Sequence, residues 1–368
     1  MNIWIDVCHT PQFNFFKPVI EALAKKGNAI YITVLDRGKT PRIVRHDVEG
    51  LPNVHVDVVG RHQMNKWSAI FEANLLRMAK LMVWAIGKHI DVALTTSMFP
   101  PIIGKLYGFP AYTFGDDAQV FDFKIKNRWA TRSHMCMYEW TLDKPKPEKT
   151  EILRCLKEWA YLNPRTFVPN PNTLDKYGVK PKEYMFLREV TVGTINYTGQ
   201  ASGAILGIKD MIPAGMKVLF SLEEKKRRNE YPADWILLQE PIEDIHSLIY
   251  YSAGLVSSGD SMAREAALLG VPSYYLGIRY SMPANAAASK VASLSNRKTM
   301  PFEEWISNLG FQDSSLGFQD SSLGFQDSNF KFNILDMERK QQELRKHIDD
   351  EFIDINEYML GLVEQSNL

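Results

Sequence analysis

The segment of residues 256–272 combines a short apolar run, a turn of small polar residues and a helix-forming stretch closed by Gly270 and Pro272. This order predicts a strand, a turn and a helix, with Ser258 or Asp260 as the helix N-cap. The first turn of such a helix presents backbone N–H groups without helical partners and the positive end of the helix dipole. This turn is therefore a candidate phosphate-binding site.

Of the two carboxylates in this segment, one supports a nucleotide site and the other argues against it. Glu265 lies one turn further into the helix, where it could accept hydrogen bonds from a ribose diol. Asp260 stands in the turn, and its charge repels a phosphate unless it caps the helix and points away. Any α/β protein also needs Gly and a capping Ser or Asp between a strand and a helix, with or without a ligand. The residues alone leave both alternatives open.

The rest of the chain alternates strands and helices. Apolar runs and helical spacing in the first half predict strands at 3–7, 29–34, 54–58, 91–95 and 110–114, and helices at 15–26, 40–49 and 67–88. The second half predicts strands at 184–190, 217–221, 235–239, 254–257 and 273–276, and helices at 242–251, 261–269 and 284–294. This βαβ rhythm indicates an α/β fold, with ligands at the carboxyl ends of parallel strands.

The chain of 368 residues is long enough for two domains with separate cores. Residues 143–182 are dense in Pro and Lys, which resist regular structure, so we expect a first domain over 1–182 that ends in a Pro-rich linker. A second domain would cover 183–329. It includes, at 309–329, three near-perfect copies of a seven-residue unit, interpreted as a duplicated surface loop without a catalytic role. The charged helical segment 330–368 is expected to cross back to the first domain.

Composition excludes several classes of function. A formal net charge of +0 argues against nucleic acid as a general partner. The three cysteines are widely spaced, and the paired aspartates have no ligand pattern, so neither a disulfide framework nor a metal site is expected. No Gly-x-Gly-x-x-Gly follows the first strand, which disfavours a dehydrogenase. The start of the chain lacks a signal-peptide pattern, which favours a cytoplasmic location.

Residues 75–86 are apolar apart from Arg77 and Lys80. The stretch is too short to span a bilayer and is typical of a buried helix. With Arg77, Lys80 and Lys88 on its borders, the helix would alternatively touch a membrane surface, and the protein would then be peripheral to the inner face of the membrane.

Several short motifs follow one another along the chain. They are Ile3-Trp4-Ile5-Asp6 with His9, Gly60-Arg61-His62, Glu158-Trp159-Ala160-Tyr161-Leu162, Pro169-Asn170-Pro171 and Gly259-Asp260-Ser261-Met262 with Glu265. Their order and spacing resemble the DUF354 family, which is grouped with the GT-B glycosyltransferases and the non-hydrolysing UDP-N-acetylglucosamine 2-epimerases. The resemblance implies a GT-B architecture of two Rossmann-like domains facing across a cleft, with the nucleotide held by the second domain and the acceptor by the first.

The resemblance also implies roles for particular residues. Glu265 would hold the ribose, and Arg188, at the end of a strand, would reach the phosphates, although an ordinary ion pair is its alternative. The diphosphate would lie on Ser258, Gly259, Asp260, Ser261, Met262 and Ala263. Weaker cleft assignments fall on Asn14, Asn196, Gln200 and Ser202.

Transfer to an acceptor also requires removal of a proton. His9 is the best base because histidine titrates near neutrality, and a hydrogen-bonded loop role is its alternative. Asp116, beside Asp117, is the second choice, with turn capping as its alternative. Where histidines are expected in the family, this chain carries Gln12, Asn14 and Asn196, and amides cannot act as bases near neutral pH.

These inferences favour a glycosyltransferase that uses a nucleotide-diphosphate sugar as substrate, without a metal or other cofactor. Its acceptor would be a glycan or a lipid-linked molecule, in the synthesis of a surface polysaccharide or glycoconjugate. A nucleotide-sugar 2-epimerase and a nucleotide-sugar-binding homologue with weakened catalysis are the alternatives.

Overall fold

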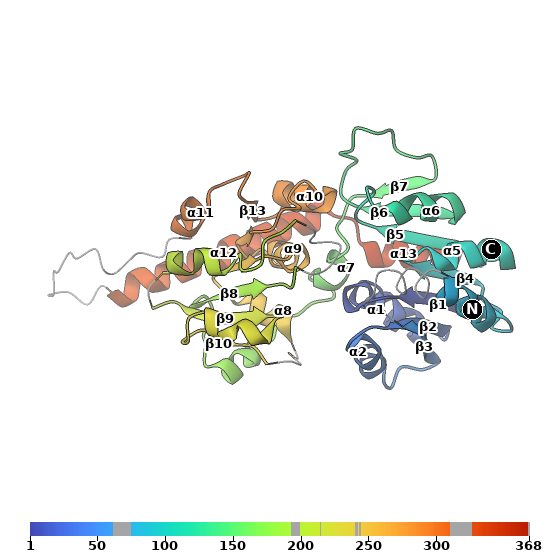
Figure 1. Cartoon of the computed structure of the whole chain (residues 1–368), viewed down its shortest axis with the longest axis horizontal. Coiled ribbons are helices and arrows are strands. Elements are labelled where there is room, and N and C mark those ends of the chain that lie inside the picture. The colour runs from blue at the N-terminus through green and yellow to red at the C-terminus, as the bar shows by residue number, and fades with distance from the viewer. Residues whose placement is uncertain are drawn as a thin grey trace. The chain divides into compact units, whose positions relative to one another are not determined.

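The computed structural model describes residues 1–61, 75–192, 199–213, 215–239, 242, 244–309 and 326–366. The chain forms two compact units, one made of Met1–Thr166 with Glu351–Leu368 and the other of Phe167–Asp350 (Figure 1). The division after Thr166 falls inside the Pro-rich segment, whereas the sequence placed it at residue 182. The repeat residues 310–325 lie outside the described residues.

The sheet of the first unit has seven parallel strands in the order β3-β2-β1-β4-β5-β6-β7. The strands are β1 (Asn2–Val7), β2 (Ala29–Asp36), β3 (Val54–Arg61), β4 (Val92–Thr95), β5 (Ala111–Gly115), β6 (Arg132–Cys136) and β7 (Thr150–Leu153). The central β1 is almost entirely buried, which explains its unbroken apolar run. All five strands expected in this half are confirmed. The sequence missed β6 and also β7, because β7 lies in the Pro-rich segment expected to be irregular.

The helices of the first unit surround this sheet. They are α1 (Thr10–Lys25), α2 (Thr40–Asp47), α4 (Arg77–Ala85), α5 (Phe99–Tyr107), α6 (Phe121–Trp129), α7 (Trp159–Leu162) and α13 (Ile355–Gln365). The sequence placed the start of α1 near residue 15, but Pro11 occupies its first turn, where proline is tolerated. Only Cys8 and His9 therefore separate β1 from α1. Prolines in the first turn of α5 likewise concealed that helix.

The sheet of the second unit has six parallel strands in the order β10-β9-β8-β11-β12-β13. They are β8 (Tyr184–Glu189), β9 (Lys217–Leu222), β10 (Ile236–Leu237), β11 (Gly254–Ser257), β12 (Ser273–Tyr275) and β13 (Leu294–Asn296). The helices are α8 (Ile245–Tyr250), α9 (Asp260–Leu268), α10 (Pro283–Val291), α11 (Phe302–Asn308) and α12 (Gln326–Glu351). The expected strands are confirmed except that β10 is shorter, and β13 was not predicted.

A buried ion pair anchors α4 to the first sheet. Arg77 donates to both carboxylate oxygens of Asp6, at 2.6 and 3.1 Å, and to the carbonyl of Val59 at 3.0 Å. Thr33 and Ser97 each donate a hydroxyl to Asp6 at 2.6 Å. Burying both charges is tolerated because each is paired and hydrogen-bonded. The sequence placed Arg77 on the border of a membrane-facing helix, and this was wrong because its side chain is 1% exposed.

The remainder of α4 is not buried on all sides, contrary to the first expectation for residues 75–86. Arg77, Leu81 and Ala85 face the sheet, whereas Val83 and the following Ile86 are exposed. Across the described ranges, no helix combines the length and apolar character needed to cross a bilayer.

Candidate functional site

The turn between β11 and α9 is built from small residues that bond to one another. The Ser258 N–H donates to the carbonyl of Arg188 at 3.0 Å, and the Ser258 hydroxyl accepts the Val190 N–H at 2.9 Å. The Ser257 hydroxyl accepts the Gly259 N–H at 3.0 Å. Gly259 is the N-cap, and no side chain caps the helix. The sequence assigned the cap to Ser258 or Asp260, and this was wrong because Ser258 bonds backward to the strand β8.

Asp260 is the first residue of α9, and its charge is balanced by arginines. Its carboxylate lies 3.1 Å from the guanidinium of Arg279 and 3.6 Å from that of Arg264. Arg264 is itself buried and donates to Asn285 at 2.6 Å. The two cations offset the repulsion that Asp260 would exert on a phosphate, since opposite charges a few ångströms apart largely cancel at longer range. Ser261 and Met262 follow in the first turn, and Ala263 is buried.

Arg188 is the penultimate residue of β8 and lies directly beside this turn, because its partner in the neighbouring strand is Ser257. Its guanidinium donates to the Ser221 hydroxyl at 2.8 Å and to the Glu223 carboxylate at 2.5 Å. The second oxygen of Glu223 accepts the Thr191 N–H at 2.8 Å. Arg188 is thus held in an ion pair next to the turn, and it is aligned by the same carboxylate that fixes the loop after β8.

Glu265 lies on α9 and is nearly buried. Its carboxylate is 3.6 Å from Nε2 of His246, which belongs to the first turn of α8. The structure therefore places Glu265 against a neighbouring helix. A ribose diol would compete with His246 for the same oxygens.

Of the two described residues expected in the loop after β8, one lies at the turn before α9. Gln200 is buried, and its amide donates to the carbonyl of Ser258 at 2.8 Å, while its Oε1 has no partner. Ser202 is exposed and bonds to Arg227. Asn196 lies outside the described residues. Gln200 is thus brought to the α9 turn, and Ser202 is not.

His9 connects β1 to α1 at the carboxyl end of the first sheet. It is the N-cap residue of α1 and makes no side-chain capping bond, and among the described residues its buried Nδ1 has no hydrogen-bond partner. Burial, together with the nearby cations Lys157 and Arg37, lowers the pKa of His9 to about 4. The imidazole is therefore neutral near pH 7 and retains an unshared electron pair.

Asp116 follows β5 at the same end of the sheet. Its carboxylate forms an ion pair with Lys157 at 2.9 Å. The charge of Asp116 raises the pKa of His9, whereas the charge of Lys157 lowers it. Asp117 caps a turn by accepting the Gln119 N–H at 2.9 Å, which was the alternative for this aspartate pair. Gln12, in the first turn of α1, accepts the Cys8 N–H at 2.7 Å. Asn14 lies partly buried on the next turn.

Sequence reasoning missed several charged neighbours of these residues: Lys157, Glu223, His246, Arg264 and Arg279. Arg279 could have been found, because it follows β12 and parallel strands end at one edge. Lys157 was concealed by its position in the segment expected to be a linker. Within the described ranges, no group of three or more His, Cys, Asp or Glu side chains could hold a metal ion.

The fold and the sequence were compared with those of known proteins. No family model matches the chain. An uncharacterized protein of Methanocaldococcus jannaschii is 23% identical over 293 residues, which cover 74% of this chain and 80% of that protein.

Solved structures match over most of the chain. The glycosyltransferase VinC, solved in complex with dTDP, has a TM-score of 0.60 at 12% identity and covers 100% of both chains. The UDP-GlcNAc 2-epimerase of Methanocaldococcus jannaschii also has a TM-score of 0.60 at 12% identity, over 85% of this chain and 92% of that one. The spinosyn rhamnosyltransferase SpnG, with its aglycone, has a TM-score of 0.59 at 12% identity, over 99% and 100%. The two Rossmann-like units of this chain therefore have the fold of GT-B enzymes that act on nucleotide sugars.

Proposed function

We propose that the protein is a glycosyltransferase that uses a nucleotide-diphosphate sugar, and that it belongs to the DUF354 family. The observation that carries the proposal is the turn at Gly259, where an uncapped helix N-terminus lies beside Arg188 and Arg279. Backbone N–H groups and guanidinium groups together are the usual ligands of a diphosphate.

The first unit would supply the acceptor side of the reaction. The acceptor hydroxyl oxygen forms a bond to the anomeric carbon, and its proton passes to the neutral imidazole of His9. The bond from that carbon to the diphosphate oxygen breaks, and its electron pair leaves with the diphosphate. The turn at Gly259 and Arg188 would stabilise the charge that develops on this leaving group. The acceptor would be a glycan or a lipid-linked molecule of a surface polysaccharide or glycoconjugate.

Two observations support alternative functions. The fold is shared with a UDP-GlcNAc 2-epimerase, so epimerisation at C2 without an acceptor is a second candidate. Gln12 and Asn14 occupy the first turns of α1, where they offer hydrogen bonds but no base near neutral pH, so a nucleotide-sugar-binding protein with weakened catalysis is a third.

Incubation with uridine, guanosine, cytidine and thymidine diphosphate sugars separates these functions. Release of the nucleoside diphosphate only in the presence of a glycan or lipid-linked acceptor supports the transferase. A new sugar isomer without acceptor would identify an epimerase instead. A thermal shift without turnover would identify a binding protein. A ligand at a hundred times its Kd stabilises a folded protein by roughly 2.7 kcal/mol, which is readily measured.

A further inference from the structure

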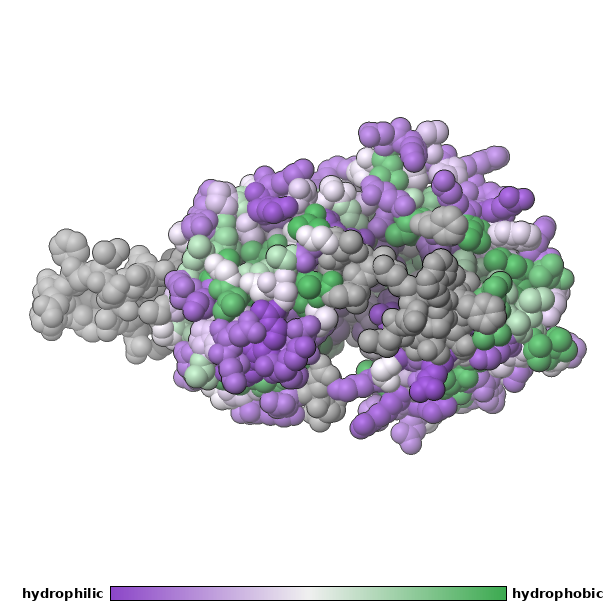
Figure 2. Space-filling view, viewed as in Figure 1, coloured by the Kyte–Doolittle hydropathy of each residue, from purple (hydrophilic) through white to green (hydrophobic). Residues whose placement is uncertain are grey.

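The outer faces of α4 and α5 carry a group of exposed apolar side chains. Val83 is 70% exposed, Ile86 67% and Leu106 56%, and Leu75 and Tyr107 are also exposed. Figure 2 shows hydrophobic residues at the surface at the end of the first unit that carries α5. Single exposed apolar residues are normal, but a group on adjacent helices indicates an interaction surface.

Contacts connect part of this group across the two helices. The Tyr107 hydroxyl donates to the Met82 carbonyl at 3.1 Å, which joins the C-terminal ends of α5 and α4. Ile86, Tyr107 and Phe109 line a shallow hollow of about 530 Å³. Asp91 also lines it, with its carboxylate engaged by the Asn2 N–H at 2.7 Å.

The buried pair of Asp6 and Arg77 fixes which face of α4 points outward. A Cβ atom on Gly60 would lie 2.9 Å from the Arg77 side chain, so this side chain packs closely against the end of β3. The apolar face is thus a fixed feature of the unit.

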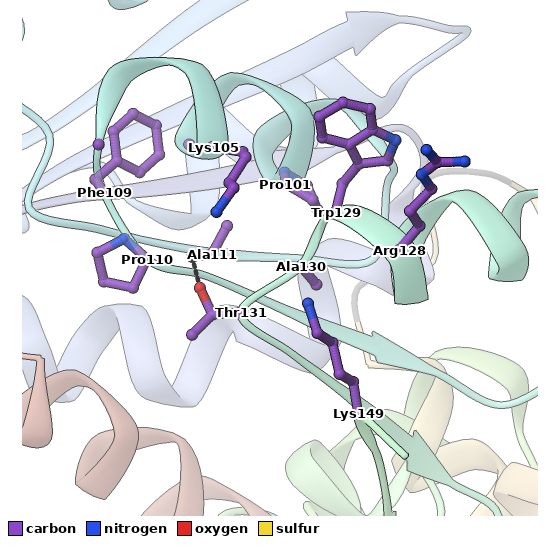
Figure 3. A pocket seen from close by; sticks show the side chains of 12 residues that line it. Pro101, Lys105, Phe109, Pro110, Ala111, Arg128, Trp129, Ala130, Thr131 and Lys149 are labelled. Carbon is purple, nitrogen blue, oxygen red and sulfur yellow. Dashed lines mark hydrogen bonds between the residues drawn. The ribbon is translucent and has the colours of Figure 1, made fainter. Parts of the chain in front are cut away.

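A second, basic pocket adjoins this surface through Phe109, which lines both. The pocket has a volume of about 630 Å³, and its cationic side chains are Lys105 from α5, Arg128 from α6 and Lys149 just before β7. No Asp or Glu lines it. None of the three cations forms an ion pair within the described part of the chain. Figure 3 shows Lys105 and Lys149 reaching into the pocket from opposite sides.

Aromatic side chains complete the surface. Trp129 lines the basic pocket, is 36% exposed, and lies under the Arg128 guanidinium at 5.9 Å. Tyr107 lines the hollow beside Ile86 and is exposed. Trp and Tyr prefer the headgroup level of a bilayer, where one end of the ring is apolar and the other is wet.

We propose that this surface of α4, α5 and the basic pocket docks the first unit on a membrane that contains anionic lipids. Val83, Ile86 and Leu106 enter the boundary between headgroups and acyl chains, and Lys105 and Lys149 hold a lipid phosphate. Apolar insertion and cationic attraction are the two signals that together give stable peripheral binding. Charge complementarity selects an anionic bilayer over a protein partner, because the pocket offers three cations and no carboxylate.

The position of the surface within the unit fits this role. Ala111 begins β5 and Thr131 precedes β6, so the basic pocket lies at the amino ends of the strands. His9 and Asp116 follow the carboxyl ends of β1 and β5. A membrane bound at one edge of the sheet therefore leaves the opposite edge accessible. This inference does not depend on the proposed sugar chemistry.

Cosedimentation of the full chain with vesicles tests the proposal. We expect binding to phosphatidylcholine vesicles that contain phosphatidylglycerol, weaker binding at higher salt, and little binding to phosphatidylcholine alone. The double substitution Lys105→Glu with Lys149→Glu should lower the affinity about tenfold or more, since each cation near an anionic surface contributes about fivefold. Val83→Ser with Ile86→Ser should lower it by about tenfold.

Matched controls lie in the second unit. Lys180→Glu with Lys226→Glu makes the same change in net charge at exposed positions, and Val168→Ser removes an exposed apolar side chain. Both controls should bind vesicles as the unchanged protein does. Melting temperatures of all variants check that they are folded. If the variant with Val83→Ser and Ile86→Ser does not fold, the variant with Lys105→Glu and Lys149→Glu decides the test.

Other outcomes would overturn the proposal. Absence of binding to either vesicle, or equal binding to both with no effect of Lys105→Glu and Lys149→Glu, contradicts it. Equal losses in the controls would show a general charge effect. Full competition by millimolar inorganic phosphate would assign the pocket to a soluble phosphate.

Discussion

The two units place a strand, a short turn and a helix at the carboxyl ends of their sheets, yet the two turns differ in how their charges are paired. In the second unit Arg188 and Asp260 each have an oppositely charged partner inside the unit, and Glu265 lies beside His246. In the first unit His9 keeps a buried Nδ1 without a partner. We therefore expect a ligand of the second unit to replace the partner of an existing ion pair. A ligand of the first unit would instead supply a hydrogen bond that His9 lacks among the described residues.

The largest expected effect comes from the unpartnered histidine. If His9 is the base, His9→Gln should lower kcat for glycosyl transfer by about 10²- to 10⁴-fold while the thermal shift with nucleotide sugar stays unchanged, because general base catalysis contributes by this factor. His46→Gln, on the exposed face of α2, is the matched control. Full activity of the His9 variant would reduce that residue to a loop role.

Acid stability gives the next largest effect. The folded-state pKa of His9 is about 4, below the ordinary 6.5, so the unfolded chain binds more protons between these values. Stability present above about pH 6.5 is therefore lost as pH falls toward 4, by on the order of 3 kcal/mol for this group. Urea unfolding at several pH values should show a weaker acid dependence for His9→Gln.

The core histidine His134 provides an internal reference for that experiment. Burial also lowers its pKa to about 4, so its own contribution to acid sensitivity remains in the His9 variant. An unchanged pH dependence in His9→Gln would mean that His9 is not buried as neutral imidazole.

The ion pairs of the second unit predict a smaller loss, in binding. Arg188→Ala should weaken nucleotide-sugar binding roughly tenfold to a hundredfold, since hydrogen bonds to charged groups contribute about 1.5–3 kcal/mol. Glu265→Ala should act similarly through the ribose. Thermal shifts measured against ligand concentration give both values, with little change expected in the unliganded melting point. Undiminished shifts in both variants would remove these residues from the site.

The smallest expected effect tests whether Arg188 leaves its partner Glu223 when a diphosphate binds. Glu223→Gln keeps Arg188 but removes the carboxylate that holds it. If the guanidinium transfers from Glu223 to a diphosphate, this variant should bind nucleotide sugar as tightly as the unchanged protein or a few-fold more tightly, because less attraction is lost on binding. Titration calorimetry beside Arg188→Ala measures the difference. Weakened binding in both would indicate that the intact pair shapes the site.

Most of the sheet strands could be predicted because parallel strands buried on both faces are short apolar runs. The residues that follow those strands could be identified for the same reason, since strand ends share one edge of the sheet. The misses have physical causes. The helix α5 was not predicted, because prolines in its first turn break the helical pattern, and the Pro-rich surroundings of β7 concealed a regular strand.

The partners of charged groups could not be predicted. Arg77 looked like a border residue because its sequence neighbours are apolar, yet it is buried against Asp6, which lies far away in the chain. Lys105, Arg128 and Lys149 are far apart in the sequence, and only the folding of α5, α6 and β7 places them around one pocket.

By itself, the sequence determined the α/β alternation, the strand ends that carry Arg188 and His9, and the small-residue turn before α9. These are local properties, since apolar runs, glycine and proline act within a few residues. The tertiary structure alone decided that Asp260 is balanced by Arg279, that Asp116 is paired with Lys157, and that Nδ1 of His9 is left without a partner. Burial and charge pairing depend on residues distant in the chain, which only packing brings within a few ångströms.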